Sequence, residues 1–306
     1  MRVTVTGAYG FIGSHVCREL VSKGHDVVGI DSCTYAADPA RVKDLDMIVH
    51  QMDICDQEML QDLLKTSGTE VIVNTAAETH VDNSIVSSSK FVKSNVDGVR
   101  SILDACRITG TSLLHFSTDE VYGVPLDSAF TEESGLNPRN PYSATKAAAD
   151  LLIRSYEVTH GFKTLTLRPS NNFGTGQHSE KFIPTIIRSL RSGKGVPVYG
   201  DGMQEREWTS VKDTARAVEF LLRDFERNAG QIFNLSSGAS MTNLKIVEKI
   251  VSVLFPGEDY RKYLNWVNDR PGHDRKYWIS SSKIVNLGFV FEEEFEETVE
   301  DVCNSV

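Results

Sequence analysis

Short apolar runs alternate with amphipathic segments over the first two thirds of the chain. The runs are rich in β-branched residues and predict strands at 3–6, 26–31, 47–51, 71–74, 113–117 and 163–168. Apolar positions at helical spacing predict helices at 11–23, 57–65, 88–108 and 142–160. Strands and helices that alternate in this way connect through right-handed crossovers. The pattern therefore predicts a doubly wound parallel sheet of the α/β class.

The pattern loosens after Pro169, where glycines separate shorter elements. Helices are predicted in this part at 181–192, 211–226, 242–255 and 294–304. We expect residues 1–173 to form a larger domain, to which about 209–236 return. We expect residues 174–306 to form a second, smaller mixed α/β lobe that closes over a ligand.

Composition narrows the classes of function. Of the 306 residues, 40% are hydrophobic and 24% are charged, which is an ordinary globular mixture, and the formal net charge is −10. A chain this acidic is a poor candidate for binding nucleic acid. None of the five cysteines stands in a C-x-x-C pair, so no zinc site, other metal or redox motif is expected. No apolar run is long enough to span a bilayer and the first residues are typical of a strand, so we expect a cytoplasmic protein that does not bind membranes.

Gly7, Gly10 and Gly13 join the first predicted strand to the first predicted helix with the spacing G-x-x-G-x-x-G. Glycine allows a tight turn and the close approach of a pyrophosphate, and the free N–H groups at the helix start attract phosphate. Asp31 ends the second strand, where a carboxylate binds a ribose 2′-hydroxyl and repels a 2′-phosphate. All four residues also occur in ordinary turns. Their position between strand and helix nevertheless favours a dinucleotide site that prefers NAD to NADP.

Further cofactor contacts are expected at the ends of the next two strands. Asp53 and Ile54 follow the third strand, and Ala76, Ala77 and Glu78 follow the fourth. Because the carboxyl ends of parallel strands meet at one edge of a sheet, we expect the first two to bracket the adenine and the other three to line the cofactor.

Tyr142 and Lys146 form a Y-x-x-x-K pair, whose spacing places both side chains on one face of a helix. A tyrosine hydroxyl is a poor base near neutrality, but a nearby ammonium group lowers its pKa. The pair can then take a proton from a substrate hydroxyl while hydride leaves the same carbon for NAD. A tyrosine at a helix start beside a surface lysine gives the same pattern. The position of Tyr142 and Lys146 after the fifth strand nevertheless favours the catalytic interpretation of the pair.

Thr118, Asp119 and Glu120 follow the fifth strand at the same edge of the sheet. A solvated acidic turn is the simpler interpretation of an isolated Asp-Glu pair. Within a cleft, however, two carboxyl groups in unlike environments supply the acid and the base that elimination of water requires. Thr118 is placed to hydrogen-bond the reacting hydroxyl.

These motifs extend from end to end, and the sequence resembles the extended short-chain dehydrogenase/reductase family, whose members have a Rossmann fold. Within that family it is most similar to the dTDP-glucose 4,6-dehydratases. The resemblance rests on TGAYGFIG, DSCTYA, AAETHVDNSI, STDEVYG, NPYSATKAAAD, RPSNNFGTGQHSEKFIP, YGDGMQEREW and RPGHDRKY.

The resemblance implies an NAD-dependent enzyme that removes water from a nucleoside-diphosphate hexose. Tyr142 would be the base for oxidation at carbon 4, with Lys146 tuning it and Thr118 aiding the step. Glu120 would then remove the proton at carbon 5, and Asp119 would protonate the departing carbon 6 hydroxyl before hydride returns to carbon 6. The implied reaction converts dTDP-glucose to dTDP-4-keto-6-deoxyglucose, with NAD held as a regenerated prosthetic group.

Other binding residues follow from the resemblance alone. The NAD site would include, besides Tyr142 and Lys146, the residues Phe11, Ile12, Ser32, Thr34, Asn95 and Asn171. The substrate site would include Thr118, His80, Asn171, Asn172, Glu180, Lys181, Arg206, Arg270 and His273. Guanidinium groups suit a diphosphate because they are planar, always charged and bidentate. A homodimer formed by the helices near 88–108 and 142–160 is also implied.

Three positions depart from the family pattern. Asn83 stands where relatives commonly carry Arg, His178-Ser179 where they often show Phe-Pro, and Glu207 where they carry Asp beside Trp208. These departures leave open whether the nucleotide is thymidine or uridine and which hexose it carries.

Two other functions remain open at this stage. An NDP-sugar 4-epimerase or decarboxylase would use Tyr142 and Lys146 without the Asp119–Glu120 pair. A non-catalytic NAD-binding protein could dispense with Tyr142 and Lys146 as well.

Overall fold

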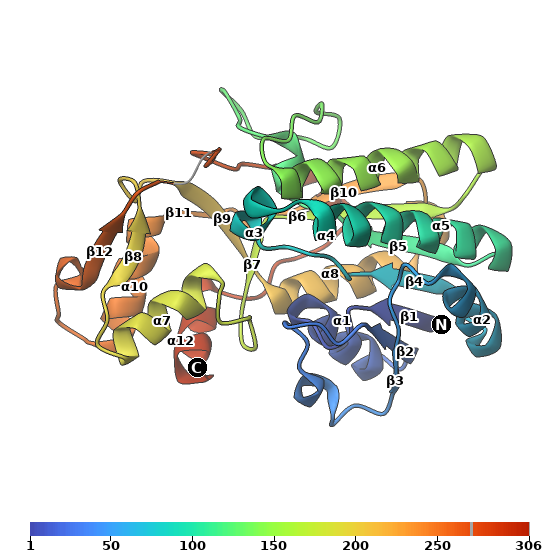
Figure 1. The fold of residues 1–306 in the computed structure, drawn as a ribbon, viewed down its shortest axis with the longest axis horizontal. Helices are drawn as coiled ribbons and strands as arrows, with labels where there is room; N and C mark the ends of the chain where they lie inside the picture. Colours follow the sequence, from blue (N-terminus) through green and yellow to red (C-terminus); the bar gives the residue numbers. More distant parts are fainter. Residues whose placement is uncertain (270–271, 306) are drawn as a thin grey trace.

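Seven parallel strands form the main sheet of the computed structural model, which describes residues 1–269 and 272–305. Their order is β10-β6-β5-β4-β1-β2-β3 (Figure 1). The strands are β1 (Arg2–Thr6), β2 (Asp26–Asp31), β3 (Ile48–Gln51), β4 (Val71–Asn74), β5 (Ser112–Phe116), β6 (Thr164–Pro169) and β10 (Gln231–Leu235). The chain first adds β2 and β3 on one side of β1 and then β4, β5, β6 and β10 on the other side. The predicted doubly wound fold is therefore confirmed.

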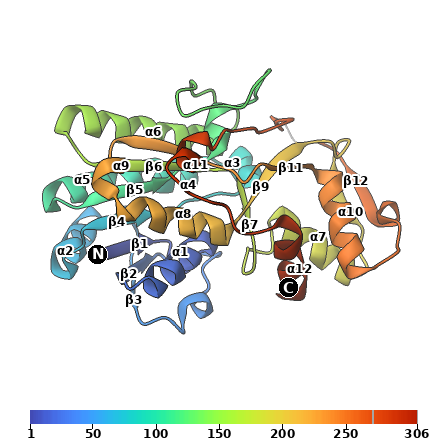
Figure 2. The ribbon, with the colours of Figure 1, turned by 180° about the vertical axis from the view of Figure 1, so that it is seen from behind.

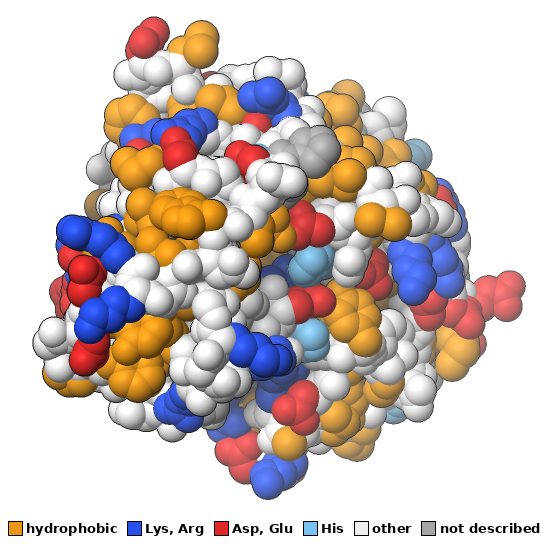
Figure 3. Space-filling view, turned by 60° about the vertical axis from the view of Figure 1, so that its left-hand side comes forward, with side chains coloured by type: hydrophobic (Ala, Val, Ile, Leu, Met, Phe, Trp, Pro, Cys, Tyr) orange, Lys and Arg blue, Asp and Glu red, His pale blue; other side chains and the backbone are white. Residues whose placement is uncertain are grey.

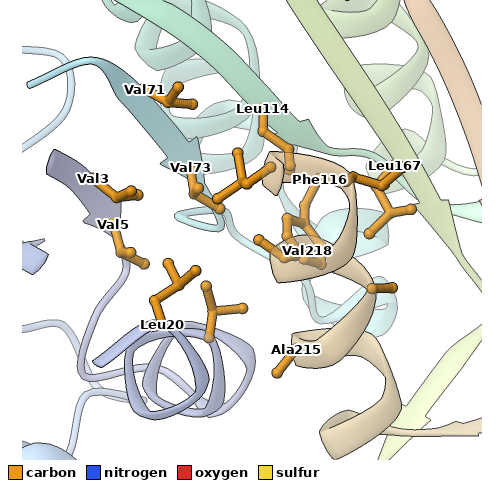
Figure 4. Packing of buried hydrophobic residues seen from close by; sticks show 14 of the residues in the cluster. Val3, Val5, Leu20, Val71, Val73, Leu114, Phe116, Leu167, Ala215 and Val218 are labelled. Carbon is orange, nitrogen blue, oxygen red and sulfur yellow. The ribbon is translucent and has the colours of Figure 1, made fainter. Parts of the chain in front are cut away.

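Helices cover both faces of the main sheet (Figures 1 and 2). One face carries α1 (Phe11–Ser22) and α8 (Val211–Arg223), and the other carries α2 (Gln57–Ser67), α5 (Gly98–Thr109) and α6 (Pro141–His160). Val5 and Val73 of the sheet pack with Leu20 of α1 and Val218 of α8 (Figure 4). Because both faces are buried in this way, the strands read as nearly continuous apolar runs in the sequence.

The predicted helix at 88–108 is divided in the structure. α4 (Ser89–Val92) is followed by the π-helical turn η2 (Lys93–Asp97) and then by α5. The wider turn carries Asn95, whose Oδ1 accepts a hydrogen bond from the Glu78 backbone N at 2.9 Å. Asn95 Nδ2 donates to the Glu78 carbonyl oxygen and to Thr145 Oγ1, both at 3.0 Å. The turn therefore ties the segment after β4 to helix α6, as π turns near functional sites often do.

A second lobe lies to one side of the main sheet (Figure 1). Its strands form a mixed three-stranded sheet in the order β11-β9-β7 and a parallel pair β12-β8. They are β7 (Asn171–Phe173), β8 (Val196–Tyr199), β9 (Glu205–Ser210), β11 (Ala239–Thr242) and β12 (Leu264–Val267). The lobe's helices are α7 (Phe182–Arg191), α10 (Asn243–Leu254) and α12 (Phe295–Ser305). Trp208 packs with Ile186 and Ile246 in a hydrophobic core that belongs to this lobe.

The chain returns from the second lobe to the main sheet through α8 and β10. Strand β10 lies parallel to β6, with Phe233 opposite Leu167. Both side chains are buried in the core that α1 and α8 cover. The remaining short elements are η1 (Pro39–Val42), α3 (Val81–Val86), η3 (Asp119–Tyr122), α9 (Phe225–Asn228), η4 (Tyr260–Tyr263) and α11 (Ser282–Asn286).

Two features are absent from the described residues 1–269 and 272–305. No helix in them has the length and apolar character needed to cross a membrane. No group of three or more His, Cys, Asp or Glu side chains in this part of the chain is arranged to hold a metal ion.

Candidate active site

A cleft of about 330 Å³ follows the carboxyl edge of the main sheet. The residues directly after β1, β4 and β5 line it with Gly7, Thr75 and Ser117. The segment before α7 adds Gln177, His178, Glu180 and Lys181 to the lining. Viewed from the side of the second lobe, acidic, basic and histidine side chains gather near the middle of the molecule (Figure 3). Ligands of open α/β sheets bind at this edge.

Most of the residues predicted from the sequence line this cleft. Those predicted for NAD are Gly7, Gly10, Phe11, Ile12, Gly13, Asp31, Ser32, Thr34, Asp53, Ile54, Ala76, Ala77, Glu78, Tyr142, Lys146 and Asn171. Those predicted for catalysis or substrate are Thr118, Asp119, Glu120, Asn172, Glu180 and Lys181. The fold therefore brings together side chains that are far apart in the sequence.

Some predicted residues lie elsewhere. Asn95 does not line the cleft, because its side chain is hydrogen-bonded to the backbone of Glu78 and to Thr145 of helix α6. His80 is the N-cap of α3, where its Nδ1 accepts a hydrogen bond from Asn83 N at 3.4 Å. Arg270 lies outside the described residues.

Arg206 and His273 also lie outside the cleft lining. The Arg206 guanidinium carbon stands 4.2 Å from the centroid of the Tyr277 ring, and its Nη2 donates to the Asp274 carbonyl oxygen at 2.8 Å. His273 Nδ1 lies 2.6 Å from Asp269 Oδ1. Arg206 is buried, and its positive charge acts to lower the pKa of Asp119, although burial raises that pKa by more.

The loop after β1 fits the pyrophosphate of a dinucleotide. Gly7 has a φ of +69°, and a Cβ on Gly13 would overlap the Gly7 carbonyl oxygen, so both positions require glycine. Asp31 is buried at the end of β2, where its Oδ2 accepts from Tyr9 N at 3.0 Å and its Oδ1 from Cys33 N at 2.7 Å. These bonds hold the carboxylate at the wall of the cleft, as a ribose-binding carboxylate needs. The glycine-rich loop that contains Gly7, Gly10 and Gly13, called the glycine cradle below, fits NAD together with the Asp31 carboxylate.

Several lining residues were not predicted individually: Tyr35, Arg41, Gln177 and His178. Tyr35 OH donates to Glu180 Oε1 at 3.3 Å, and the Tyr35 ring meets the His178 ring edge-on with centroids 5.6 Å apart. The segment before α7 therefore contacts the loop after β2. No spacing rule identifies these loop residues. The one available signal was that they lie close to or within segments on which the family resemblance rested.

Tyr142 and Lys146 line the cleft from the first turns of α6. Lys146 Nζ donates to the Phe116 carbonyl oxygen and lies 3.5 Å from His115 Nε2. Burial lowers the pKa of Lys146 to about 8. Burial also raises the pKa of Tyr142, and the negative charge of Glu120 adds to that increase. The pKa of Tyr142 is therefore raised and not lowered as predicted, because desolvation of the phenol is the largest contribution.

Asp119 and Glu120 begin the short helix η3 and occupy unlike environments. Asp119 is 3% exposed; its Oδ1 accepts from Thr118 Oγ1 at 3.1 Å, and its Oδ2 has no hydrogen-bond partner among the residues described. Burial, with the nearby charge of Glu120, raises the pKa of Asp119 to about 8, so this carboxyl group is mostly protonated at neutral pH. Glu120 Oε2 instead accepts from Asn140 Nδ2 at 3.0 Å and from Tyr277 OH at 3.3 Å. One cleft thus offers a protonated acid beside a hydrogen-bonded carboxylate.

A glycine cradle and a Tyr–Lys pair at the same edge of a parallel sheet define an NAD-binding enzyme of the α/β class. The chain belongs to the NAD dependent epimerase/dehydratase family, whose model matches residues 3–236.

Similarity to individual relatives covers almost the whole chain. The chain is 44% identical to the low-salt glycan biosynthesis protein Agl12 of Haloferax volcanii over 98% of this chain and 96% of that protein. It is 38% identical to a dTDP-glucose 4,6-dehydratase of Streptomyces niveus over 98% and 92% of the two chains. The crystal structure of the dTDP-glucose 4,6-dehydratase DesIV from Streptomyces venezuelae, with NAD bound, is 35% identical and superimposes with a TM-score of 0.94 over 99% and 96%. The resemblance inferred from the motifs is confirmed.

Proposed function

We propose that the protein is an NAD-dependent nucleoside-diphosphate-hexose 4,6-dehydratase that converts dTDP-glucose to dTDP-4-keto-6-deoxyglucose. The observation that carries this proposal is that Asp119 and Glu120 line the same cleft as Tyr142 and Lys146. A 4-epimerase needs the Tyr–Lys pair but not a second acid and base. Full-length similarity to several relatives named dTDP-glucose 4,6-dehydratase supports the choice of substrate.

The cofactor site supports the redox part of the reaction. When bound, NAD supplies a reversible hydride acceptor next to the sugar. The N–H groups around Gly10 and Gly13, at the start of α1, would bind its pyrophosphate. Asp31 would accept a hydrogen bond from a ribose hydroxyl. The other residues that we propose for this site are those predicted for NAD that line the cleft.

Oxidation at carbon 4 needs a base for the hydroxyl proton. Tyr142 would take this proton, with its phenol oxygen held in the cleft by α6. Burial and the charge of Glu120 raise the pKa of Tyr142, and its hydrogen bond with Thr118 opposes that increase. Thr118 would favour the phenolate form when its one hydroxyl proton turns from Asp119 to the phenol oxygen, and Lys146 adds positive charge on the same helix face.

Elimination needs a second base and an acid. Glu120 would remove the proton at carbon 5, which the carbon 4 ketone makes acidic, and Asp119 would protonate the carbon 6 hydroxyl as the carbon–oxygen bond breaks. One water leaves, and a hydride at carbon 6 with a proton at carbon 5 completes the product. The raised pKa of Asp119, about 8, keeps the acid protonated at neutral pH.

The nucleotide end of the substrate would contact the segments around β7 and before α7. Asn172 Oδ1 and Gln177 Oε1 are buried acceptors without a hydrogen-bond partner in the described part of the chain, so they suit substrate hydroxyl or N–H donors. Lys181 Nζ contacts both the carbonyl oxygen and Oγ1 of Thr79 at 3.1 Å, which keeps its positive charge at the cleft. Asn171 and Glu180 complete this part of the lining.

Mass spectrometry of the purified protein with dTDP-glucose tests the proposal. We expect a product lighter by one water, formed faster than with UDP-glucose. An isomer of unchanged mass would indicate an epimerase. Unchanged sugars across a panel of nucleoside-diphosphate hexoses, with NAD still bound, would indicate a non-catalytic protein.

The pH dependence of turnover follows from two groups in the cleft. We expect kcat to fall as pH rises through about 8, because Asp119 and Lys146, whose pKa values are both about 8, then lose their protons. Asp119 loses the proton that it donates, and Lys146 loses its positive charge, so both effects lower the rate. A profile of kcat from about pH 6 to about pH 10 measures this limb. A rate that still rises above about pH 9 would contradict the assignment.

We also infer a homodimer built on the helices over 88–108 and 142–160. Exposed apolar side chains on this side of the molecule support an interface, with Val86 on α3, Val92 on α4, and Leu151 and Val158 on α6. Sedimentation velocity should give twice the chain mass of 34.0 kDa, and Leu151→Asp should shift the protein toward monomer. A parent protein that sediments as a monomer at micromolar concentration would refute the dimer.

Cytoplasmic location is a further part of this proposal. The five cysteines are all unpaired, although two of them, Cys33 and Cys55, are not fully buried. Free thiols of this kind suit a reducing compartment.

A further inference from the structure

We infer that Asn140 positions the proposed base Glu120 and couples it to the helix that carries Tyr142; this inference rests on the function proposed above. Asn140 is the N-cap of α6, where its Oδ1 accepts a hydrogen bond from Ser143 N at 2.8 Å. Ser143 Oγ accepts one from Asn140 N at 3.3 Å, which completes a capping box. Asn140 Nδ2 donates to Glu120 Oε2 at 3.0 Å. A single side chain thus caps the helix and contacts the base.

The choice of asparagine at this cap has a chemical reason. Serine, threonine and aspartate cap helices about as well, because the cap itself needs only an acceptor oxygen. An amide also carries an N–H donor on a separate atom, so Asn140 can satisfy the helix and Glu120 at the same time. Asn140 is 7% exposed, which makes both hydrogen bonds hard to replace with water.

Tyr277 is the other donor within reach of Glu120, but its proton is shared. Tyr277 OH lies 3.3 Å from Glu120 Oε2 and 2.8 Å from Asp274 Oδ2. A phenol has one proton, and the shorter contact indicates that it is directed mainly to Asp274. Of the two donors that the structure describes next to Glu120, Asn140 therefore makes the stronger hydrogen bond. Both contacts fall on Oε2, so neither of them occupies Oε1.

This arrangement makes the two halves of the proposed reaction depend differently on Asn140. Oxidation uses Tyr142, Thr118 and Lys146, none of which bonds to the Asn140 amide N–H group. Elimination uses Glu120, whose orientation depends on that group. Loss of the amide with the cap retained should therefore slow elimination and spare oxidation.

Asn140→Ser and Asn140→Asp test this difference, because both keep an acceptor for the helix cap and both remove the amide donor. The rate of NADH appearance after mixing with dTDP-glucose reports oxidation. Entry of solvent deuterium at carbon 5 reports proton removal. For Asn140→Ser we expect oxidation within about threefold of the parent and proton removal slower by about ten- to a hundredfold, with NADH accumulating.

Asn140→Asp should be slower still in proton removal, since it places a second carboxylate against Glu120 while still capping the helix. Tyr277→Phe should slow the same step by less than Asn140→Ser does. Melting temperatures within a few degrees of the parent would show that α6 remains capped.

Equal slowing of both steps in the two Asn140 variants would reduce Asn140 to a structural cap and overturn the inference. Parent rates for both steps in Asn140→Ser would overturn it as well. A parent protein that releases no water from any nucleoside-diphosphate hexose would instead refute the proposed function, so the two failures are distinguishable.

Discussion

The Tyr142→Phe variant should lose oxidation at carbon 4, with kcat lower by about 10²- to 10⁴-fold. The change removes the oxygen that we propose takes the hydroxyl proton, while the ring keeps its place. That ring packs edge-on against Phe91 with centroids 6.5 Å apart, so folding and NAD content should stay close to the parent. Rapid mixing with dTDP-glucose should give no NADH signal, and NAD released on denaturation should match the amount of protein.

Tyr156→Phe is the matched control for this change. Tyr156 lies on the same helix, and its hydroxyl donates a hydrogen bond to Asp104 at 2.6 Å. Neither Tyr156 nor Asp104 lines the cleft. We expect turnover near the parent value. Full turnover in Tyr142→Phe would remove the proposed base, whereas equal losses in both variants would point to a general effect on α6.

The Glu120→Gln variant should stop after oxidation, with overall turnover lower by about 10²- to 10⁴-fold. Glutamine keeps the size of the side chain but has no negative charge with which to remove the carbon 5 proton. NADH should therefore appear on mixing and persist, which is the opposite of the result for Tyr142→Phe. Absorbance after rapid mixing separates the two variants directly.

Glu133→Gln serves as the control, because Glu133 is exposed and does not line the cleft. It should turn over as the parent does. If Glu120→Gln exchanged the carbon 5 hydrogen with solvent at the parent rate, Glu120 would not be the base.

The parts of the fold that the sequence predicted are those set by local pattern. The six strands through β6 and the helix of Tyr142 were found because apolar period and helix-start chemistry are local signals. The helix predicted at 88–108 was divided by a π turn, which depends on Asn95 bonding to Glu78 and Thr145 far along the chain. The short strands of the second lobe escaped prediction because three to six residues between glycines carry little periodic signal.

In the candidate site, too, features set by local spacing were predicted, and features set by distant contacts were not. The glycine cradle and the Tyr142–Lys146 pair rest on fixed spacing, which sequence displays directly. The pKa of Tyr142 was predicted in the wrong direction because burial depends on the assembled cleft. Arg206 is expected to bind substrate from the resemblance alone, and its contact with the Tyr277 ring has no signal in the sequence. A charged side chain in a sequence does not reveal which neighbour will bury it.

dTDP-glucose labelled with deuterium at carbon 4 provides the most direct measurement of the proposed reaction. The product should be the 4-keto-6-deoxy sugar with the label at carbon 6, since hydride removed at the first position returns at the second once water has left. Deuterium retained on carbon 4 of an epimerised sugar of unchanged mass would contradict the account, because the two carboxyl groups at the end of β5 would then have no part in the chemistry.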